Sequence, residues 1–465
     1  MAAVFSANEI ATAVKGRLLR GDGSVRAAGV STDTRTLEAG ELFIALKGPN
    51  FDGAQFLAQA VEKKAAGVVV EKGADVPGEG AIFVVEVADT LRALGDLARA
   101  HRSRFEIPVA GVTGSNGKTT TKEMIAAVLS ARGETRKSQG NLNNLVGLPH
   151  QVLRLGEEHA YAVFEMGMSE PGEIRRLAEI ARPRIAVITN VGPAHVEGLG
   201  SVEAVRDAKG EILEAIPPGG VAILSNEDPH SRVLAERYEA TGGRVVRFGL
   251  SPQSDFWADD IHFDAESAQF TLHCPDGERE IRIKALGRHN VLNALAAAAC
   301  ASALGVGLDE VGDGLTRVVL PKMRFEVREV PGRAGVHLLD DSYNANPASV
   351  ARALETASAL RGDGRLITVL GDMAELGLIA ESAHREVGRQ IIACGVDLFM
   401  GVGALMRFAS DEARQAGMDG ARLMNFDTPE QAASTLGGML LPGDWVLVKG
   451  SRSMMMERVI EGLEI

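Results

Sequence analysis

Hydrophobic and polar positions follow two alternating patterns along this chain. Short apolar runs such as VVVEKG at 68–73 and IPVAGV at 107–112 predict buried strands. Longer stretches with apolar residues three or four apart, such as LRALGDLARAHRSRF at 91–105, predict helices that cover those strands. Because strand and helix patterns alternate almost throughout, we predict an α/β protein built on mainly parallel sheets.

Two breaks in this alternation predict three domains. A new strand begins at Ile107 after a helical stretch, and a Val-Val-Leu-Pro segment lies at 318–321. We therefore predict a smaller N-terminal α/β domain over residues 1–104. The central domain, 105–319, should hold a mainly parallel sheet with helices on both faces and an antiparallel patch formed by RVVRFGL, AQFTLHC and REIRIKALG. The remaining residues, 320–465, alternate again and predict a doubly wound, Rossmann-like domain.

Composition narrows the classes of function. The chain has 465 residues, enough for two or three domains. A formal net charge of −13 and 4% aromatic residues argue against a nucleic-acid-binding surface. The three cysteines have no CxxC spacing and predict small buried residues in a reducing compartment. With no signal-peptide layout and no long apolar run, we expect a soluble cytoplasmic protein that does not insert into membranes, and we expect a monomer.

The stretch GVTGSNGKTTTKE at 111–123 carries the first chemical signal. It fails the strict phosphate-loop spacing, because Val112 stands where that spacing needs glycine. Nevertheless, a strand precedes it, and a helix that we expect to be closed by Gly133 follows. Glycines between them allow backbone amides to turn toward an anion at the helix amino end. We predict a nucleotide site in which Lys118 contacts the outer phosphates and Thr119 binds magnesium. The site is formed by Thr113, Gly114, Ser115, Asn116, Gly117, Lys118, Thr119 and Thr120. The alternative is a tight turn beside a solvated lysine.

Two further residues follow strands of the same domain. Glu165 ends the strand AVFEMG, and His195 lies just beyond RIAVITN. Open α/β sheets bind ligands beyond the carboxyl ends of their strands, so both side chains are candidate ligands of a phosphate-bound divalent ion. A lone Glu or His is otherwise an ordinary surface or core residue.

The segment TGSNGKTT resembles the variant phosphate loop of the Mur ligase superfamily, which includes the folylpolyglutamate synthases. The likeness extends over essentially the whole chain and implies ATP with two magnesium ions. It implies that Lys209, which on the residues alone is a solvated helix lysine, is carbamylated and binds metal. It also implies that the adenine side of ATP is bound by His289 and Asn290, and its phosphate and ribose by Arg324 and Asp341.

The N-terminal segment STDTRTLEAGELFIALKG is similar to the uridine-nucleotide domain of the later Mur ligases. The bare residues are equally consistent with an ordinary turn-and-strand surface. The resemblance implies that UDP-N-acetylmuramoyl-tripeptide is held by Ser31, Asp33, Arg35, Lys47 and Gly48. It implies that the muramoyl part is held by Asn141 and Asn144 in GNLNN, although such loops often only satisfy turns.

Three C-terminal motifs, DDSYNANP at 340–347, LGDMAELG at 370–377 and VLVKGSR at 446–452, complete the resemblance. They imply D-alanyl-D-alanine as the incoming amine, bound by Tyr343, Asn344, Asn346 and Ser451. The implied reaction activates a carboxylate as an acyl phosphate, with Lys118, Glu165, His195, Lys209 and Arg324 as catalytic residues. A phosphate-loop kinase, a nucleotide switch or transport ATPase, and a folylpolyglutamate synthase remain alternatives.

Overall fold

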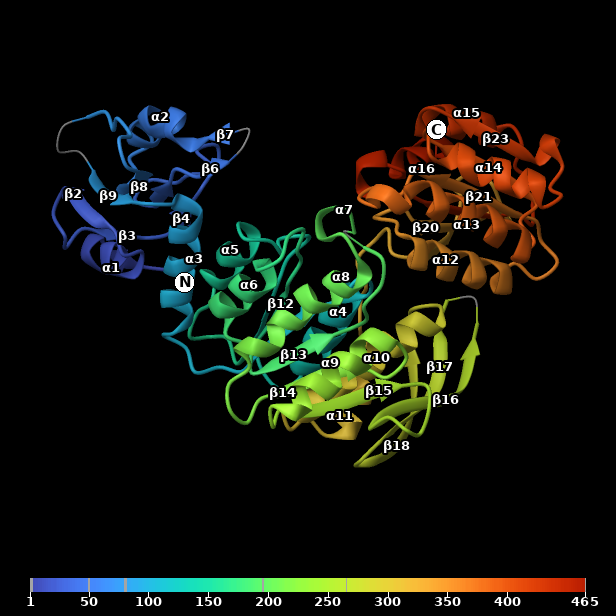
Figure 1. The fold of residues 1–465 in the computed structure, drawn as a ribbon, viewed down its shortest axis with the longest axis horizontal. Coiled ribbons are helices and arrows are strands. Elements are labelled where there is room, and N and C mark those ends of the chain that lie inside the picture. Colours follow the sequence, from blue (N-terminus) through green and yellow to red (C-terminus); the bar gives the residue numbers. More distant parts are fainter. Residues whose placement is uncertain (1–2, 49–50, 79–81, 195, 265, 465) are drawn as a thin grey trace. The chain divides into compact units, whose positions relative to one another are not determined.

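The structure, a computed structural model, describes residues 3–48, 51–78, 82–194, 196–264 and 266–464. Strands and helices alternate along them (Figure 1). The chain forms two compact units. The first comprises residues 1–113, 132–186 and 211–221, and the second comprises 114–131, 187–210 and 222–465. His195, a predicted metal ligand, lies outside the described residues.

The first unit begins with a five-stranded sheet in the order β2-β9-β8-β5-β4. Its strands are β2 (Arg17–Arg20), β9 (Phe83–Val87), β8 (Gly67–Glu71), β5 (Leu42–Ile44) and β4 (Val30–Ser31), and only β2 runs antiparallel to its neighbour. Helix α2 (Leu57–Glu62) places Leu57 and Ala60 in one core with residues of β5 and β8. Two further helices, α1 (Ala7–Ala13) and α3 (Thr90–Arg102), pack against each other.

The same unit contains three parallel strands of the central sheet. They are β11 (Thr135–Lys137), β12 (Tyr161–Glu165) and β10 (Val109–Thr113), in that order. Register pairs Val112 of β10 with Glu165 of β12, so Glu165 lies beside the end of the strand that leads into the glycine loop. Helices α5 (Gly147–Val152) and α6 (Glu173–Ala181) pack against α3.

The whole central sheet has the strand order β11-β12-β10-β13-β14-β15-β16-β17-β18. After β13 (Ile185–Ile188), β14 (Val221–Ser225) and β15 (Arg244–Gly249), a meander of β16 (Phe256–Phe263), β17 (Ala268–Cys274) and β18 (Gly277–Ile283) is antiparallel. In the second unit, α4 (Lys118–Leu129) packs on α10 (Arg288–Ala303) and α11 (Leu308–Thr316). Helix α10 is buried at almost every position from Asn290 to Ala301, as its alanine-rich sequence allows.

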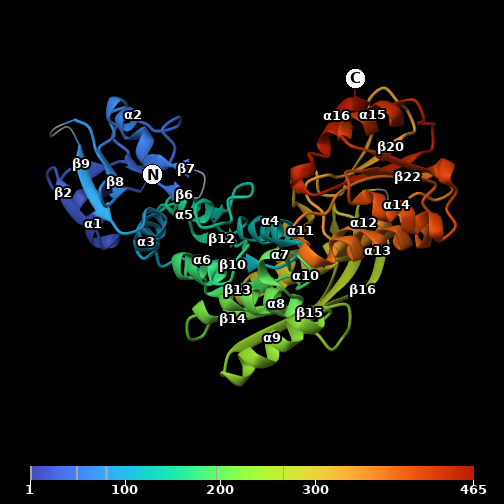
Figure 2. The same ribbon diagram turned by 45° about the horizontal axis from the view of Figure 1, so that its top comes forward.

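The C-terminal sheet has six strands in the order β19-β20-β24-β21-β22-β23. Only β19 (Glu326–Glu329) is antiparallel; β20 (His337–Asp341), β24 (Trp445–Lys449), β21 (Leu366–Gly371), β22 (Leu398–Val402) and β23 (Leu423–Phe426) are parallel. One core joins the sheet to α12 (Pro347–Leu360), α13 (Ala380–Ala393) and α14 (Met406–Gln415). A second core joins the opposite face to α15 (Pro429–Gly437) and α16 (Glu457–Leu463) (Figure 2). Helices on both faces make this sheet doubly wound, as predicted.

Several local predictions were wrong. Helix α4 ends at Leu129, and Gly133 does not cap it; a Cβ there would lie 2.6 Å from that of Ala160, so close packing explains this glycine. The segment RVVRFGL forms β15, which pairs in parallel with β16, a strand that was not predicted. Of the three cysteines, all free, only Cys300 is buried.

No helix among the described residues is both long and apolar enough to cross a membrane.

Candidate active site

The glycine loop has the backbone that a phosphate cradle needs. Gly114 and Gly117 adopt φ values of +145° and +81°, in the region that favours glycine. A Cβ at Gly114 would collide with the Thr189 hydroxyl, and one at Gly117 would collide with Asn293. Both glycines are therefore required by conformation and by close packing. Since α4 begins directly after Gly117, its amino-terminal N–H groups lie at the end of this loop.

Two residues that follow β13 hold the middle of the loop. The Asn190 side chain accepts a hydrogen bond from the Asn116 backbone N–H at 3.0 Å and donates one to the Asn116 carbonyl oxygen at 3.0 Å. The Thr189 hydroxyl donates to the same oxygen at 2.5 Å. Ser115 is held through its backbone N–H, which donates to the Asn190 carbonyl, and through its hydroxyl, which donates to the Gly192 carbonyl. The loop conformation is thus fixed by its neighbours before any ligand binds.

The predicted phosphate-contacting side chains lie at the start of α4. The Lys118 amine donates to the Gly114 carbonyl oxygen at 2.8 Å, so it folds back over the loop. The Thr119 hydroxyl accepts a hydrogen bond from Arg324 at 2.9 Å. Thr113, which ends β10, and Thr120, which follows Thr119 on α4, are both buried.

Two C-terminal residues reach the loop from positions more than 200 residues away. One is Arg324, whose guanidinium also lies 4.2 Å from the centre of the Tyr343 ring. The other is Asn346, which caps α12 and donates from its side-chain amide to that of Asn116 at 2.8 Å. The structure therefore brings predicted ATP and substrate residues of the third domain onto the predicted phosphate loop.

Glu165 is buried at the end of β12, with 3% of its surface exposed. Its carboxylate accepts a hydrogen bond from the Asn143 side chain at 2.8 Å, and its backbone N–H donates to the Ser138 hydroxyl. A carboxylate held at a strand end beside β10 has the oxygen donors that magnesium prefers. Among the described residues, a set without His195, no three His, Cys, Asp or Glu side chains form a metal-binding cluster.

Lys209 is not the solvated lysine that its helical sequence indicates. It lies on α8 (Val202–Gly210) with 1% of its surface exposed. Burial, together with the positive charge of Lys118, lowers the pKa of the Lys209 amine well below its usual value. No hydrogen bond or ion pair of its amine involves any residue that the structure describes. This shift favours the neutral amine that carbamylation requires.

The segment that opens α10 is tied to α4. The Asn290 side chain donates to the Leu286 carbonyl and accepts from Asn293, which in turn accepts from Thr121 at 3.2 Å. Burial and the charges of Arg352 and Lys449 lower the pKa of the neighbouring His289 to about 3, so this ring is neutral at physiological pH. A neutral imidazole and satisfied amides suit contact with an uncharged base.

At the carboxyl ends of the C-terminal strands, Lys449 links the DDSYNANP motif to β24. Its amine lies 2.6 Å from the Asp341 carboxylate and donates to the Asn344 carbonyl at 2.7 Å. Burial raises the pKa of Asp341, and Lys449 opposes this shift. Ser451 donates to the Ala345 carbonyl and accepts from the Ala374 N–H. Asp341, Asn344 and Ser451 therefore meet at one edge of the sheet.

The predicted uridine segment contacts the helix that follows the predicted muramoyl loop. The Thr32 hydroxyl, beside Ser31 and Asp33, lies 3.0 Å from the His150 ring on α5, just beyond the Asn141–Asn144 loop. Asp33 pairs with Arg35 at 2.6 Å, and both are exposed. Asn144 accepts hydrogen bonds from the N–H groups of Val146 and Gly147, so it also serves its own turn. Lys47 and Gly48 form the short exposed strand β6 (Lys47–Gly48).

Comparison with known proteins decides the family. Three family models match in sequence: the Mur ligase family catalytic domain over residues 26–102, the Mur ligase middle domain over 112–301, and the Mur ligase glutamate ligase domain over 323–452. The UDP-N-acetylmuramoyl-tripeptide–D-alanyl-D-alanine ligase of Bacillus subtilis is 37% identical, over 94% of this chain and 93% of its own. This chain belongs to the Mur ligase family.

Solved Mur ligases share the fold. MurF from Acinetobacter baumannii has a TM-score of 0.91 at 33% identity and covers 100% of this chain, with 99% of its own chain covered. MurF from Thermotoga maritima, solved with ADP, has a TM-score of 0.83 at 28% identity, and the match covers 94% of this chain and 96% of that one. The predicted family and the predicted three-domain α/β fold are confirmed, and the chain is an ATP-dependent, peptide-bond-forming Mur ligase by family.

Sequence reasoning missed several residues of this site. Thr189 and Asn190 hold the loop, yet around the strand RIAVITN only His195, beyond its end, was predicted to be functional. Asn293 lies one helical turn after Asn290, and Asn143 contacts Glu165. Lys449 stands in the quoted VLVKGSR motif. A polar residue directly at a strand's carboxyl end is the signal that could have identified Asn190 and Lys449.

Proposed function

We propose that this chain joins D-alanyl-D-alanine to UDP-N-acetylmuramoyl-tripeptide at the expense of ATP. The products are UDP-N-acetylmuramoyl-pentapeptide, ADP and phosphate, and the pentapeptide serves peptidoglycan synthesis. The observation that carries this proposal is the 37% identity to a ligase of that name over more than nine tenths of both chains. Its substrates are water-soluble, and we propose that it acts in the cytoplasm as a monomer.

In this proposal the glycine loop and two cationic side chains bind the phosphates. Backbone N–H groups of Gly117, Lys118 and Thr119 bind the phosphate oxygens, helped by the amino end of α4. The Lys118 amine, which donates to the Gly114 carbonyl at the loop, binds the γ-phosphate. Arg324, already at Thr119, neutralises charge on the phosphoryl group as it moves to the tripeptide carboxylate.

We propose that Thr119 and Glu165 hold magnesium through their oxygens, with His195 as a further ligand. Their hydroxyl, carboxylate and imidazole donors fit a divalent ion. When bound, magnesium neutralises charge on the ATP phosphates. No side chain among these needs to act as a nucleophile, because the amine of the dipeptide attacks the acyl phosphate directly.

Lys209 has a defined role in the proposal. Carbon dioxide reacts only with a neutral amine, and burial beside Lys118 lowers the pKa of Lys209 and so favours that form. Its nitrogen bonds to the carbon of carbon dioxide, a proton leaves to solvent, and an anionic carbamate results. That anion would place two more oxygen donors in the site and would offset the charge of Lys118.

The third domain supplies the second substrate site. Tyr343, Asn344, Asn346 and Ser451 lie in or beside loops at the carboxyl ends of the C-terminal strands, where ligands of doubly wound sheets bind. Support comes from Arg324 and Asn346, which connect these loops to the phosphate loop. Binding of D-alanyl-D-alanine there would exclude water from the acyl phosphate.

The test is product formation by the purified protein with ATP and magnesium, followed by mass spectrometry. We expect UDP-N-acetylmuramoyl-pentapeptide only when both the tripeptide and D-alanyl-D-alanine are present. If L-glutamate extends a folate substrate instead, or if a phosphorylated tripeptide accumulates as the final product, the proposal is wrong.

A further inference from the structure

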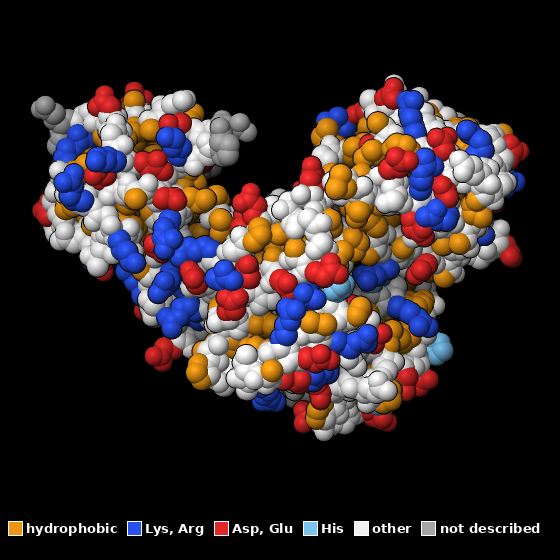
Figure 3. Space-filling model, in the orientation of Figure 1, with side chains coloured by type: hydrophobic (Ala, Val, Ile, Leu, Met, Phe, Trp, Pro, Cys, Tyr) orange, Lys and Arg blue, Asp and Glu red, His pale blue; other side chains and the backbone are white. Residues whose placement is uncertain are grey.

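A second positively charged pocket lies on the first unit, along helix α3. Its volume is about 310 Å³, and it is lined by the end of α1, one face of α3 and the residue that ends α6. Its charged residues are Lys15, Arg92, Asp96, Arg99 and Arg182. Four cations face one carboxylate in a chain whose formal net charge is −13. Figure 3 shows the Lys and Arg side chains gathered over α3.

Three of the four cations of this pocket have no acidic partner among the described residues. Lys15, Arg99 and Arg182 form no ion pair with any residue that the structure describes. The one carboxylate, Asp96, is already held by Arg176 at 2.7 Å, and Arg92 lies 3.9 Å from it. Unpaired cations that line one concave surface raise the local positive potential and attract anions.

A buried arginine adds to this charge. Arg102, one turn beyond Arg99 on α3, donates to the carbonyl oxygens of Ala181, Phe105 and Ile107 and to no carboxylate. Arg102 does not line the pocket, but its positive charge acts on Arg182, which does.

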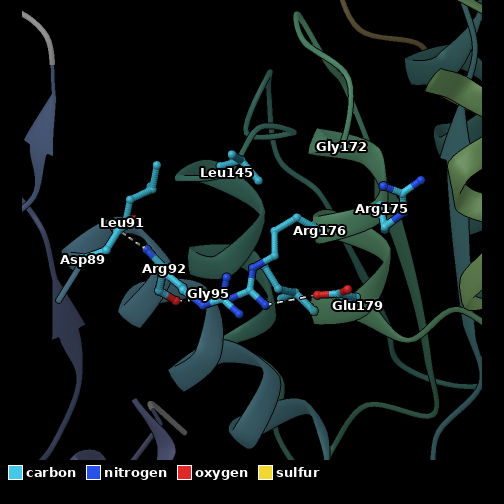
Figure 4. A pocket seen from close by; sticks show the side chains of 10 residues that line it. Asp89, Leu91, Arg92, Gly95, Leu145, Gly172, Arg175, Arg176 and Glu179 are labelled. Atoms are coloured by element: carbon cyan, nitrogen blue, oxygen red, sulfur yellow. Dashed lines mark hydrogen bonds and ion pairs between the residues drawn. The ribbon is translucent and has the colours of Figure 1, made fainter. Parts of the chain in front are cut away.

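The neighbouring pocket shows what a purely structural arginine cluster looks like. It has a volume of about 340 Å³ and contains Arg92, Arg175 and Arg176 (Figure 4). There Arg175 pairs with Glu214 at 2.7 Å, and Arg176 pairs with Asp96 and Glu179. These arginines hold elements together and leave little charge for a ligand, in contrast to the α3 pocket.

Backbone conformation gives a separate reason to assign a role to two of the cations. Lys15 and Arg182 have φ values of +53° and +50°, the left-handed region that favours glycine, and both follow a helix end. Retaining a long cationic side chain at such a position costs stability relative to glycine. Attraction to the helix carboxyl ends offsets part of this cost at each site. It does not explain why both side chains line the same pocket.

We propose that the α3 pocket binds an anion with two or more phosphate groups. Guanidinium groups match phosphate oxygens with paired hydrogen bonds, and the lining offers Arg92, Arg99 and Arg182 for this. Arg92 and Arg99 are seven residues apart, roughly 10 Å along a helix, which suits two phosphate groups better than one. The ligand is either a free polyphosphorylated molecule or the headgroups of an anionic lipid surface.

The test measures binding of sodium tripolyphosphate by calorimetry in excess ADP and UDP, which occupy the other predicted phosphate sites. The double variant Lys15→Gly/Arg182→Gly removes two cations and relieves two left-handed backbones, so we expect its melting temperature to be unchanged or higher. Its Kd should rise about tenfold or more, since two charge-assisted contacts are lost. The control Lys72→Ala/Arg422→Ala removes two exposed cations elsewhere and should bind like the original protein.

A second arm distinguishes the two sources. Flotation with phosphatidylglycerol vesicles, compared with phosphatidylcholine vesicles, tests a lipid surface. If the protein binds tripolyphosphate but does not float with the vesicles, the ligand is a free molecule. If it floats with phosphatidylglycerol vesicles and the glycine variant does not, the ligand is the lipid headgroup. The proposal is overturned if neither probe binds, or if the glycine variant binds as well as the control. Because the readout is binding, failure here leaves the proposed ligase activity untouched.

Discussion

The clamp on the phosphate loop yields a quantitative prediction. Substituting Asn190→Ala removes two hydrogen bonds to the Asn116 backbone, both 3.0 Å long, and leaves the Asn116 N–H without its partner. Each bond contributes about 0.5–1.5 kcal/mol net, so the ordered loop should lose about 1–3 kcal/mol relative to alternative conformations. Part of the binding energy must then order the loop, and the apparent affinity for nucleotide falls in proportion to the fraction of molecules whose loop is already in the binding conformation. We expect the Kd for ADP to rise by roughly 5- to 150-fold.

The measurement is calorimetric titration of ADP into the variant, with its unfolding temperature recorded in parallel. Asn226→Ala is the matched control, since Asn226 likewise follows a strand of the same sheet, and its side chain bonds to none of the described residues. That control should bind ADP normally. Unchanged ADP affinity in Asn190→Ala would refute the idea that this clamp preorganises a nucleotide loop.

Three further predictions concern single side chains. Lys118→Ala should lower kcat/KM in a phosphate-release assay by a factor that corresponds to about 3 kcal/mol or more, because the ammonium group that stabilises the transferring phosphoryl group is lost. Normal turnover would show that Lys118 has no part in the mechanism. Lys209→Ala should be inactive and partly rescued by short-chain carboxylic acids, and absence of rescue would argue against the carbamate. His289 has its folded pKa lowered to about 3, so the unfolded chain takes up a proton below pH 6.5 and the folded one does not. The protein should therefore lose up to about 1.4 kcal/mol of stability per pH unit from pH 6.5 toward pH 3 through this group. In the variant His289→Asn this part of the stability loss should be absent. Urea unfolding at pH 7, 6, 5 and 4 measures the free energy of unfolding of both proteins, and identical pH profiles for the two would contradict the assignment.

The sequence indicated the fold well because its signals are local. Apolar runs such as IPVAGV and RIAVITN form strands where expected, and the alternation with helices dictates parallel sheets. Two of the strands that were not predicted, β16 and β23, carry polar residues within FWADDIHF and LMNF, which weaken an apolar-run signal. The place of Gly133 could not be predicted either, because its reason is packing against Ala160 rather than a turn.

The site was less predictable because its contacts join distant positions. Arg324 and Thr119 are 205 residues apart, and Asn116 and Asn346 are 230 apart. Resemblance placed Arg324 and Asn346 among the ATP and substrate residues, but nothing in the local pattern shows that they touch the loop. Lys209 is the clearest example, since a helical segment rich in charged residues predicts exposure and the fold buries it. Burial depends on neighbouring elements, which the local sequence does not reveal.

The central claim is that the terminal phosphoryl group of ATP passes to the tripeptide carboxylate before the amide bond forms. It can be tested with UDP-N-acetylmuramoyl-tripeptide whose terminal carboxyl carries oxygen-18, incubated with ATP, magnesium, D-alanyl-D-alanine and the protein. The account predicts that each released phosphate contains one labelled oxygen from that carboxyl group. Phosphate released without label, alongside normal product, would contradict it.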